Sequence, residues 1–187
     1  MRPSNDWQVN SLPTKVSRDL VVDTSVARSA GGEGATFPTS KNCRDCLKSI
    51  TLTPHCVVMS QPIMEEWNKH KSVFSSQWLV AMFARKRVTR IKADYNDAMR
   101  RKLQEIASNQ KDADAMLKDC HLIEAALATD GIIIARDEEV RALFSASCQL
   151  VGQMKNIMWV NPDELEEEVV SWLEAGARPD AHRMLGS

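Results

Sequence analysis

Acidic residues that follow short apolar runs carry the clearest chemistry in this sequence. Asp23 directly follows the run 20–22, and Asp137 comes shortly after the run 132–134. Such runs, rich in β-branched residues, predict buried strands. Ligands of open α/β sheets bind outside the carboxyl ends of the strands, so an acid at this position is a candidate metal ligand. It can equally cap the helix that follows, and one strand end does not distinguish the two roles.

Further acids stand on predicted helices. Asp119 lies near the start of a helix predicted over 118–128, and either Glu65 or Glu66 lies on a helix that begins near Pro62. Clustered carboxylates raise one another's pKa unless a cation lies between them. Mg²⁺ and Mn²⁺ take carboxylate oxygens as ligands, polarise phosphate oxygens and lower the pKa of bound water. A cluster of these acids therefore predicts metal-assisted hydrolysis of phosphodiesters.

The order of strands and helices predicts how these acids are brought together. Apolar runs predict strands at 19–23, 55–60, 132–135 and 157–160, with helical patterns between and after them. This alternation is typical of an α/β fold of three layers, with a mostly parallel central sheet of about four to five strands flanked by helices. Right-handed crossovers place the carboxyl ends of parallel strands along one edge, so Asp23, Asp119 and Asp137 can converge there.

The chain of 187 residues suits a single domain with a sizeable core. Residues 1–18 lack a periodic pattern and predict an extended or poorly ordered lead-in, in which Trp7 is the candidate to contact the domain. The predicted domain spans 19–175 and includes 72–110 as a helical insertion or extension. Residues 176–187 predict a loose C-terminal tail.

Residues 85–92 form the most basic stretch of the chain. Its cations are Arg85, Lys86, Arg87, Arg90 and Lys92. One interpretation is a solvated helix end, where cations are favourable, and the other is a ridge that contacts nucleic-acid phosphates. Because the formal net charge is −1, a nucleic-acid partner depends on a local patch of this kind. On the helix predicted over 95–107, Arg100 and Arg101 could extend the patch.

Cysteine use and hydropathy predict a cytoplasmic protein. The five cysteines are consistent with reduced thiols. Cys43 and Cys46 are spaced like one face of a helix, which favours core packing over a zinc or redox site. No apolar run approaches the roughly 20 residues of a membrane span, and residues 1–7 lack the apolar core of a signal peptide. We therefore expect no membrane partner.

Four segments, in order along the chain, resemble the motifs of PIN-domain nucleases. The segment 20–26 is similar to the first strand and first acid of that family, and 59–67 is similar to the helix that supplies a glutamate. The segment 118–126, Lys-Asp-Cys-His-Leu-Ile-Glu-Ala-Ala, is similar to the family's K-D-x-H-L-hydrophobic-x-A-A helix. The segment 132–138 is similar to its last acidic strand end. The resemblance leaves 1–18 and 72–110 outside the motifs.

The resemblance implies a function and a set of site residues. The implied catalytic residues, which would hold Mg²⁺ or Mn²⁺ directly or through water, are Asp23, Glu66, Asp119 and Asp137. Glu66 is preferred to Glu65 because the family's acid commonly precedes a bulky apolar or aromatic residue, here Trp67. The implied activity is an endoribonuclease that cleaves single-stranded or structured RNA with a metal-activated water. Many members are toxins, so an antitoxin protein and a homodimer are further candidate partners.

Two residues depart from the family pattern. Ala135 stands where the family usually has Ser or Thr, two residues before its last acid, and Arg136 is an unusual cation beside that acid. An alternative function is therefore a catalytically weak PIN-fold module that binds RNA or protein. A phosphatase of the haloacid dehalogenase type is disfavoured, because Ser25 stands where that family has a second aspartate. We expect His121 to be structural rather than a catalytic base.

Overall fold

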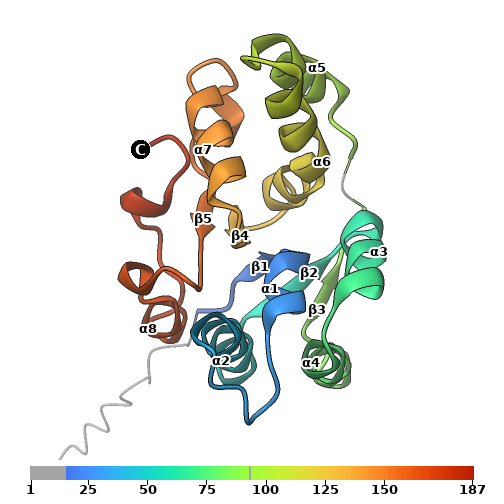
Figure 1. Ribbon diagram of the computed structural model, residues 1–187, viewed down its shortest axis with the longest axis vertical. Coiled ribbons are helices and arrows are strands. Elements are labelled where there is room, and N and C mark those ends of the chain that lie inside the picture. The colour runs from blue at the N-terminus through green and yellow to red at the C-terminus, as the bar shows by residue number, and fades with distance from the viewer. Residues whose placement is uncertain (1–15, 93) are drawn as a thin grey trace, which may run out of the picture.

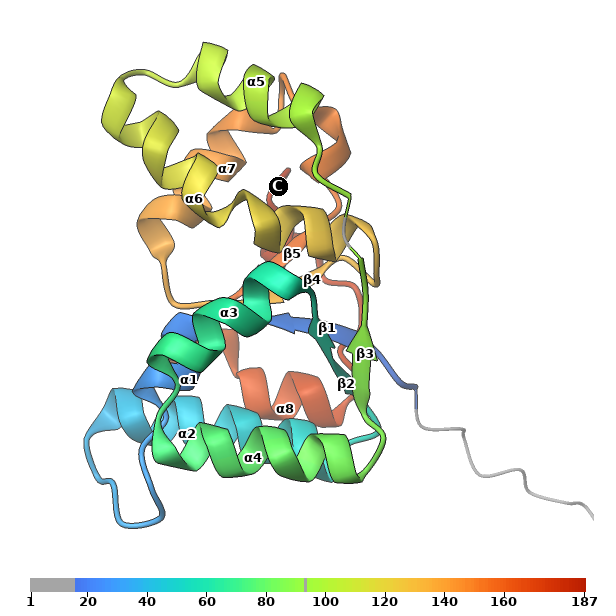
Figure 2. The same cartoon turned by 90° about the vertical axis from the view of Figure 1, so that its right-hand side faces the viewer.

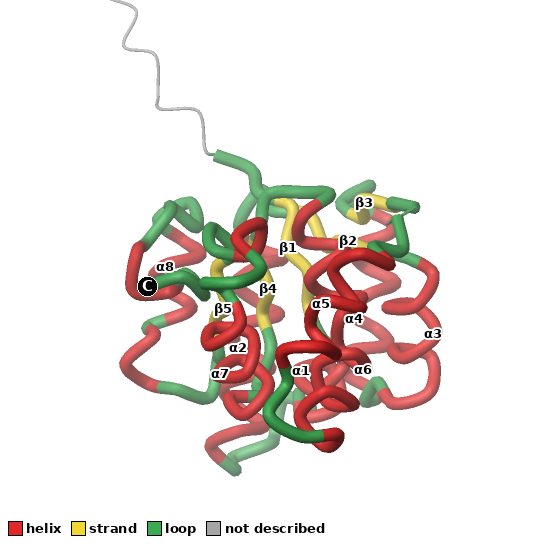
Figure 3. The backbone as a smooth tube through the Cα atoms, turned by 90° about the horizontal axis from the view of Figure 1, so that it is seen from above, coloured by secondary structure: helices red, strands yellow, loops and turns green. Residues whose placement is uncertain are grey.

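The computed structural model describes residues 16–92 and 94–187, and it contains a five-stranded parallel sheet. The strands are β1 (Asp19–Val22), β2 (Cys56–Met59), β3 (Val88–Arg90), β4 (Ile132–Ile134) and β5 (Met158–Val160). Their order across the sheet is β3-β2-β1-β4-β5, and Figure 3 shows them side by side in this order. Every neighbouring pair is parallel. The predicted three-layer α/β fold is confirmed.

Helices cover both faces of the sheet. They are α1 (Thr24–Ser29), α2 (Pro38–Leu52), α3 (Gln61–His70), α4 (Val73–Ala84), α5 (Asp97–Ile106), α6 (Gln110–Leu127), α7 (Glu138–Ser147) and α8 (Val169–Glu174). Figures 1 and 2 show α5, α6 and α7 on one side of the sheet and α2, α4 and α8 on the other. Helix α3 contacts both α1 and α6. Helix α3 therefore links α1, which follows β1, to α6.

The central strands have no exposed face, which explains their sequences. Residues 20–22 of β1 and 132–134 of β4 are each at most 1% exposed. A parallel strand with helices on both faces has no polar side, so its residues form a continuous apolar run. Val22 is paired with Ile134 in the ladder. This register places the residues that follow β1 beside those that follow β4.

Strand β3 is the element that the sequence did not predict. It runs through the basic stretch and pairs with β2, with Val57 beside Val88 and Met59 beside Arg90. Helix α4 ends at Ala84, so the interpretation as a solvated helix end holds for the exposed Arg85 and Lys86 and fails where the chain enters β3. The predicted helical segment 72–110 is interrupted by this strand. The strand is short, polar and only partly buried. Its stability comes from the ladder with β2, a distant partner that the local pattern does not reveal.

The C-terminal segment also differs from expectation. The final α-helix begins at Val169, directly after Glu168, which adopts a left-handed backbone conformation with φ of 40°. Residues 176–187 are not a loose tail. Met184 forms an antiparallel bridge with Met158 of β5, and Leu185 is buried. Most of the predicted lead-in, residues 1–15, lies outside the described residues.

The two cysteines of the CxxC sequence are buried in the core on α2. Cys43 and Cys46 are both free and fully buried. Burial raises the pKa of the Cys43 thiol to about 12. The prediction of core packing is confirmed, because both side chains belong to the buried apolar core.

None of the helices in the described part of the chain has the length and apolar character needed to cross a bilayer.

A buried histidine ties the start of β1 to α8. The Nδ1 atom of His55 accepts a hydrogen bond from the backbone N–H of Arg18 at 3.0 Å, and its Nε2 lies 2.9 Å from the carbonyl oxygen of Leu173. One ring nitrogen thus accepts and the other donates, which is the pattern of a neutral imidazole. Burial lowers the pKa of His55, since it disfavours the charged ring.

We predict that His55 makes the stability of the fold depend on pH. A histidine with a lowered pKa in the folded state contributes fully above its unfolded pKa of about 6.5, and this contribution is lost as the pH falls. His55→Phe should lower the free energy of unfolding at pH 7.5 by about 1–3 kcal/mol, because two buried polar groups lose their partner. The variant should then lose less stability than wild type between pH 7 and pH 5 in urea titrations. His70→Phe, at an exposed position, is the matched control and should keep the wild-type slope.

Candidate active site

A buried tryptophan fixes α3 against the end of β1. The Nε1 atom of Trp67 donates a hydrogen bond of 2.9 Å to the carbonyl oxygen of Val22, and its side chain is fully buried. Val22 immediately precedes Asp23, and Glu66 immediately precedes Trp67. This one bond therefore positions the backbones of two predicted site acids relative to each other.

The two adjacent glutamates of α3 have different surroundings. Glu65 is exposed and accepts a hydrogen bond from Gln61 of its own helix at 3.0 Å. Glu66 is partly buried, and its Oε2 lies 3.6 Å from Nε2 of His121 on α6. The sequence argument preferred Glu66, and the structure turns this residue toward α6 while Glu65 points along the surface. His121 also contacts the carbonyl oxygen of Lys118 through Nδ1, at 3.0 Å.

The acids at the ends of β1 and β4 both cap helices. A carboxylate oxygen of Asp23 accepts a hydrogen bond from the backbone N–H of Ser25 at 2.8 Å, at the start of α1. Asp137 accepts one from the backbone N–H of Val140 at 2.9 Å, at the start of α7. The capping role is therefore real for both residues. It uses one oxygen of each carboxylate, so it does not exclude a ligand on the other oxygen.

Two backbone contacts hold these strand ends together. The backbone N–H of Asp23 donates to the carbonyl oxygen of Ile134 at 2.9 Å, which extends the β1–β4 ladder by one bond. The hydroxyl of Ser25 accepts a hydrogen bond of 3.1 Å from the backbone N–H of Arg136. The turns that carry Asp23 and Asp137 are thus bonded to each other and cannot move independently.

Asp119 brings a third carboxyl group from α6 to the same edge of the sheet. The residue is only 7% exposed, and burial raises the pKa of its carboxyl group to about 6. The charge of Lys118, whose Nζ lies 3.6 Å from Oδ1, opposes the rise, as does His121. The negative charges of Asp23 and Asp137 add to it. Acids from β1, α6 and β4 are therefore close enough to act on one another electrostatically.

The donor chemistry of this edge fits a hard divalent cation, but the side chains do not close around one. Within residues 16–92 and 94–187, no three His, Cys, Asp or Glu side chains lie together at a spacing that would hold a metal ion. Asp23 and Asp137 are turned to their helix caps, and Glu66 is turned to His121. Binding of Mg²⁺ or Mn²⁺ would require these carboxylates to rotate toward Asp119.

A further acid, not singled out from the sequence, lies after β5. Asp163 accepts hydrogen bonds from the hydroxyl of Thr39 at 2.8 Å and from the amide of Asn42 at 3.3 Å, both on α2. It also pairs with Arg136 at 3.2 Å, while the same guanidinium donates to the hydroxyl of Ser29 at 2.7 Å. The signal in the sequence was an acid shortly after a predicted strand, the same signal that identified Asp23. Through these contacts Arg136 joins the end of α1 to the segment that follows β5.

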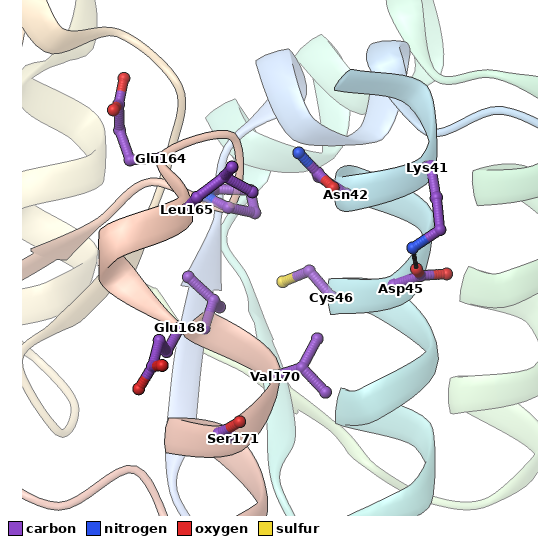
Figure 4. Close-up of a pocket in the computed structure, with 11 residues that line it drawn as sticks. Lys41, Asn42, Asp45, Cys46, Glu164, Leu165, Glu168, Val170 and Ser171 are labelled. Atoms are coloured by element: carbon purple, nitrogen blue, oxygen red, sulfur yellow. Dashed lines mark hydrogen bonds and ion pairs between the residues drawn. The ribbon is translucent and has the colours of Figure 1, made fainter. Parts of the chain in front are cut away.

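A separate hollow lies between α2 and the segment that leads into α8. Figure 4 shows Cys46 and Asn42 of α2 facing Leu165 and Val170, with Lys41 paired to Asp45 at 2.8 Å. None of the four predicted site acids lines this hollow. The candidate site is therefore the edge at the carboxyl ends of β1 and β4, and not this hollow.

The structure divides the basic stretch between opposite edges of the sheet. Arg85, Lys86 and Arg87 precede β3 and lie at its amino end, whereas Arg90 ends the strand and Lys92 follows it. Arg87 donates hydrogen bonds to the carbonyl oxygens of Ile50, Thr51 and Thr53, at the end of α2. Residues 85–87 of the predicted ridge therefore lie at the edge of the sheet opposite the acids, and any phosphate contact of Arg85 or Lys86 would be made away from them. Arg90 and Lys92 stay at the carboxyl edge.

The predicted extension of this patch onto α5 is also limited by pairing. Arg100 forms a bidentate ion pair with the buried Glu124 of α6, with two distances of 2.8 Å, and its guanidinium lies 4.3 Å from the centre of the Tyr95 ring. Arg101 pairs with Asp97 on the surface at 3.3 Å. Arg100 therefore joins α5 to α6.

Comparison of the chain with protein-family models, with curated proteins and with solved structures found no match.

We predict that neutralising Asp119 stabilises the protein at high pH. The pKa of about 6 exceeds the unfolded value, so ionisation in the folded state costs stability as the pH rises through this range. Asp119→Asn should raise the free energy of unfolding by up to about 3 kcal/mol at pH 8, since one pKa unit corresponds to about 1.4 kcal/mol. The gain should become small toward pH 4, where the carboxyl is protonated in the folded state and about half protonated in the unfolded state, whose pKa is about 3.9. Denaturant titrations at both pH values measure it.

Asp114→Asn is the matched control for Asp119, because Asp114 is an exposed acid of the same helix. Its substitution should leave stability nearly unchanged at both pH values. A loss of stability in Asp119→Asn at pH 8 would contradict the prediction and make Asp119 a structural acid.

We predict that Arg87 contributes to stability through the end of α2. Arg87→Met leaves the carbonyl groups of this helix end without their donor, so the free energy of unfolding should fall by about 1–3 kcal/mol. Arg85→Met, at an exposed position on the same segment, should change it by less than about 0.5 kcal/mol. Equal effects of the two substitutions in thermal melts would rule out this role for Arg87.

Proposed function

We propose that this protein is a Mg²⁺- or Mn²⁺-dependent endoribonuclease of the PIN type, which hydrolyses phosphodiester bonds of single-stranded or structured RNA. One observation carries the proposal. Carboxyl groups from three separate segments, Asp23, Asp119 and Asp137, are gathered at one edge of the sheet, where burial raises the pKa of Asp119 and the charges of Asp23 and Asp137 add to the rise. Such burial and repulsion destabilise the ionised carboxylates, and a bound cation would offset both.

The residues of the edge divide the chemistry between them. Asp119, from the middle of α6, and Asp23 and Asp137, from two strand ends, would supply oxygen ligands, and Glu66 would reach the same edge from α3. When bound, Mg²⁺ or Mn²⁺ supplies polarisation of a phosphate oxygen and a water of lowered pKa. Trp67 fixes the distance between α3 and β1, and the caps of α1 and α7 fix the two turns. His121, whose Nε2 lies 3.6 Å from Glu66, would be a structural neighbour of the site rather than a base.

The substrate would approach along the carboxyl end of β3. Arg90 and Lys92 are the cations of the basic stretch that lie at this edge, and the guanidinium of Arg90 lies 5.2 Å from the centre of the Phe83 ring. Cations beside an acidic edge support binding of a polyanion whose scissile phosphate reaches the metal. An antitoxin protein and a second copy of the chain are further proposed partners, by analogy with the family that the sequence resembles.

The free thiols of all five cysteines support a reducing compartment, and we propose the cytoplasm.

A second candidate function is a PIN-fold module that binds RNA or protein and cleaves weakly. Two observations favour it. The described acids do not close a three-ligand site, and Arg136 places a cation next to Asp137, paired to Asp163. In this case the acidic edge would bind an RNA or protein partner without efficient cleavage.

The two functions predict different results with labelled single-stranded RNA and Mn²⁺. A nuclease should cleave, and Glu66→Gln or Asp23→Asn should lower the cleavage rate by at least about 100-fold. Glu65→Gln is the matched control, because the two glutamates are neighbours on α3 and Glu65 points along the surface. Glu65→Gln should retain wild-type activity. A chelator should abolish cleavage by wild type and by Glu65→Gln.

Equal cleavage by wild type and Asp23→Asn would reveal a contaminating nuclease and overturn the proposal. RNA binding without cleavage, unchanged by Mn²⁺, would identify the binding module instead. Equal loss of activity in Glu65→Gln and Glu66→Gln would contradict the assignment of Glu66.

A further inference from the structure

An apolar groove runs between α2 and α4, on the face of the molecule away from α6. Its lining includes Leu52 at the end of α2 and Phe74, Trp78 and Ala81 along one side of α4. Figure 2 shows the two helices lying next to each other, and they are in contact. Leu52 is 77% exposed within residues 16–92 and 94–187, so the groove presents a large aliphatic side chain to the surface.

Helix α4 is unusual for a surface helix. Its sequence, from Val73 to Ala84, contains no charged residue, and Val73 and Val80 are 78% and 67% exposed. A surface helix normally has a charged face opposite its buried stripe. Among the described residues that line the groove, the cations are Lys48, which pairs with Glu33 at 2.7 Å, and Arg85 at the end of α4. Apolar side chains of α2 and α4 form most of the rest of the lining.

The described chain begins beside this groove. The hydroxyl of Ser17 donates a hydrogen bond of 2.8 Å to the carbonyl oxygen of Pro54, two residues after Leu52. Residues 1–15, which lie outside the described part of the chain, are thus attached next to the end of α2. Trp7 is nine residues before Val16, and an extended chain of this length reaches about 30 Å. Helix α4 has 12 residues and is about 18 Å long, so Trp7 can reach every part of the groove.

We propose that residues 1–15 dock in the groove between α2 and α4, with Trp7 as the anchor. The segment contains Trp7, Val9 and Leu12, whose apolar side chains match an apolar groove. Its tether makes the docking intramolecular, so a weak contact suffices to occupy the groove. The docked segment would cover Leu52, the large apolar side chain of the groove that the described chain leaves exposed.

Tryptophan fluorescence tests the docking in the full-length chain. The other four tryptophans, Trp67, Trp78, Trp159 and Trp172, are each at most 8% exposed. Emission that acrylamide quenches readily therefore reports on Trp7. Wild type should lack a readily quenched component. Leu52→Lys and Gln77→Lys, both at exposed positions in the groove, should each release Trp7 and add this component.

The matched control is Leu165→Lys, because Leu165 is 79% exposed but lies at the hollow between α2 and α8. It should keep Trp7 shielded. Adding Trp7→Phe to Leu52→Lys should remove the released component, which identifies its source.

Three results would overturn the docking. The first is a readily quenched Trp7 in wild type, and the second is persistent shielding of Trp7 in both groove variants. The third is shielding that disappears on dilution together with a dimer in analytical ultracentrifugation, which would make a second copy the occupant. Shielding that is independent of concentration in a monomer supports the intramolecular occupant.

Discussion

The position of β1 in the middle of the sheet is the constraint on which the candidate site depends. Parallel pairing of β1 with both β2 and β4 requires that their carboxyl ends lie at one edge. The residue after β1 therefore lies beside the residues after β4, and the hydrogen bond from Asp23 to Ile134 continues this pairing beyond the strand. The fold brings two acids together before any side chain contributes.

This arrangement disfavours the ionised form of the carboxyl groups. Carboxylates that share an edge repel, and Asp119 is also buried, so its charged form is disfavoured twice. The fold offsets the repulsion at Asp23 and Asp137 through helix caps, and at Asp163 through Arg136 and two side chains of α2. Asp119 has only the nearby charges of Lys118 and His121 to oppose its burial. A bound cation would therefore stabilise the ionised form of Asp119 more than that of the other acids.

Local patterns predicted the elements that are buried on both faces. The runs at 20–22 and 132–134 are apolar because helices cover them, and the acids after them were identified by position alone. The same patterns did not identify β3, whose residues Val88, Thr89 and Arg90 carry no apolar run. The roles of Arg87 and Arg100 were also hidden, because each donates to groups that are distant in sequence. A cation that binds a helix end or a buried acid looks, in sequence, like one that binds phosphate.

The sequence by itself determined the class of the fold and which residues stand at strand ends, since apolar periodicity and chain order are local properties. It did not by itself decide between Glu65 and Glu66, because both lie on the same predicted helix and only the family resemblance favoured Glu66. Only the tertiary structure decided that Trp67 bonds to Val22, that Asp163 joins Arg136, and that the basic stretch is split between two edges of the sheet. These depend on pairing between segments far apart in the chain. Burial and charge at such contacts are set by the assembled fold and not by any single stretch of residues.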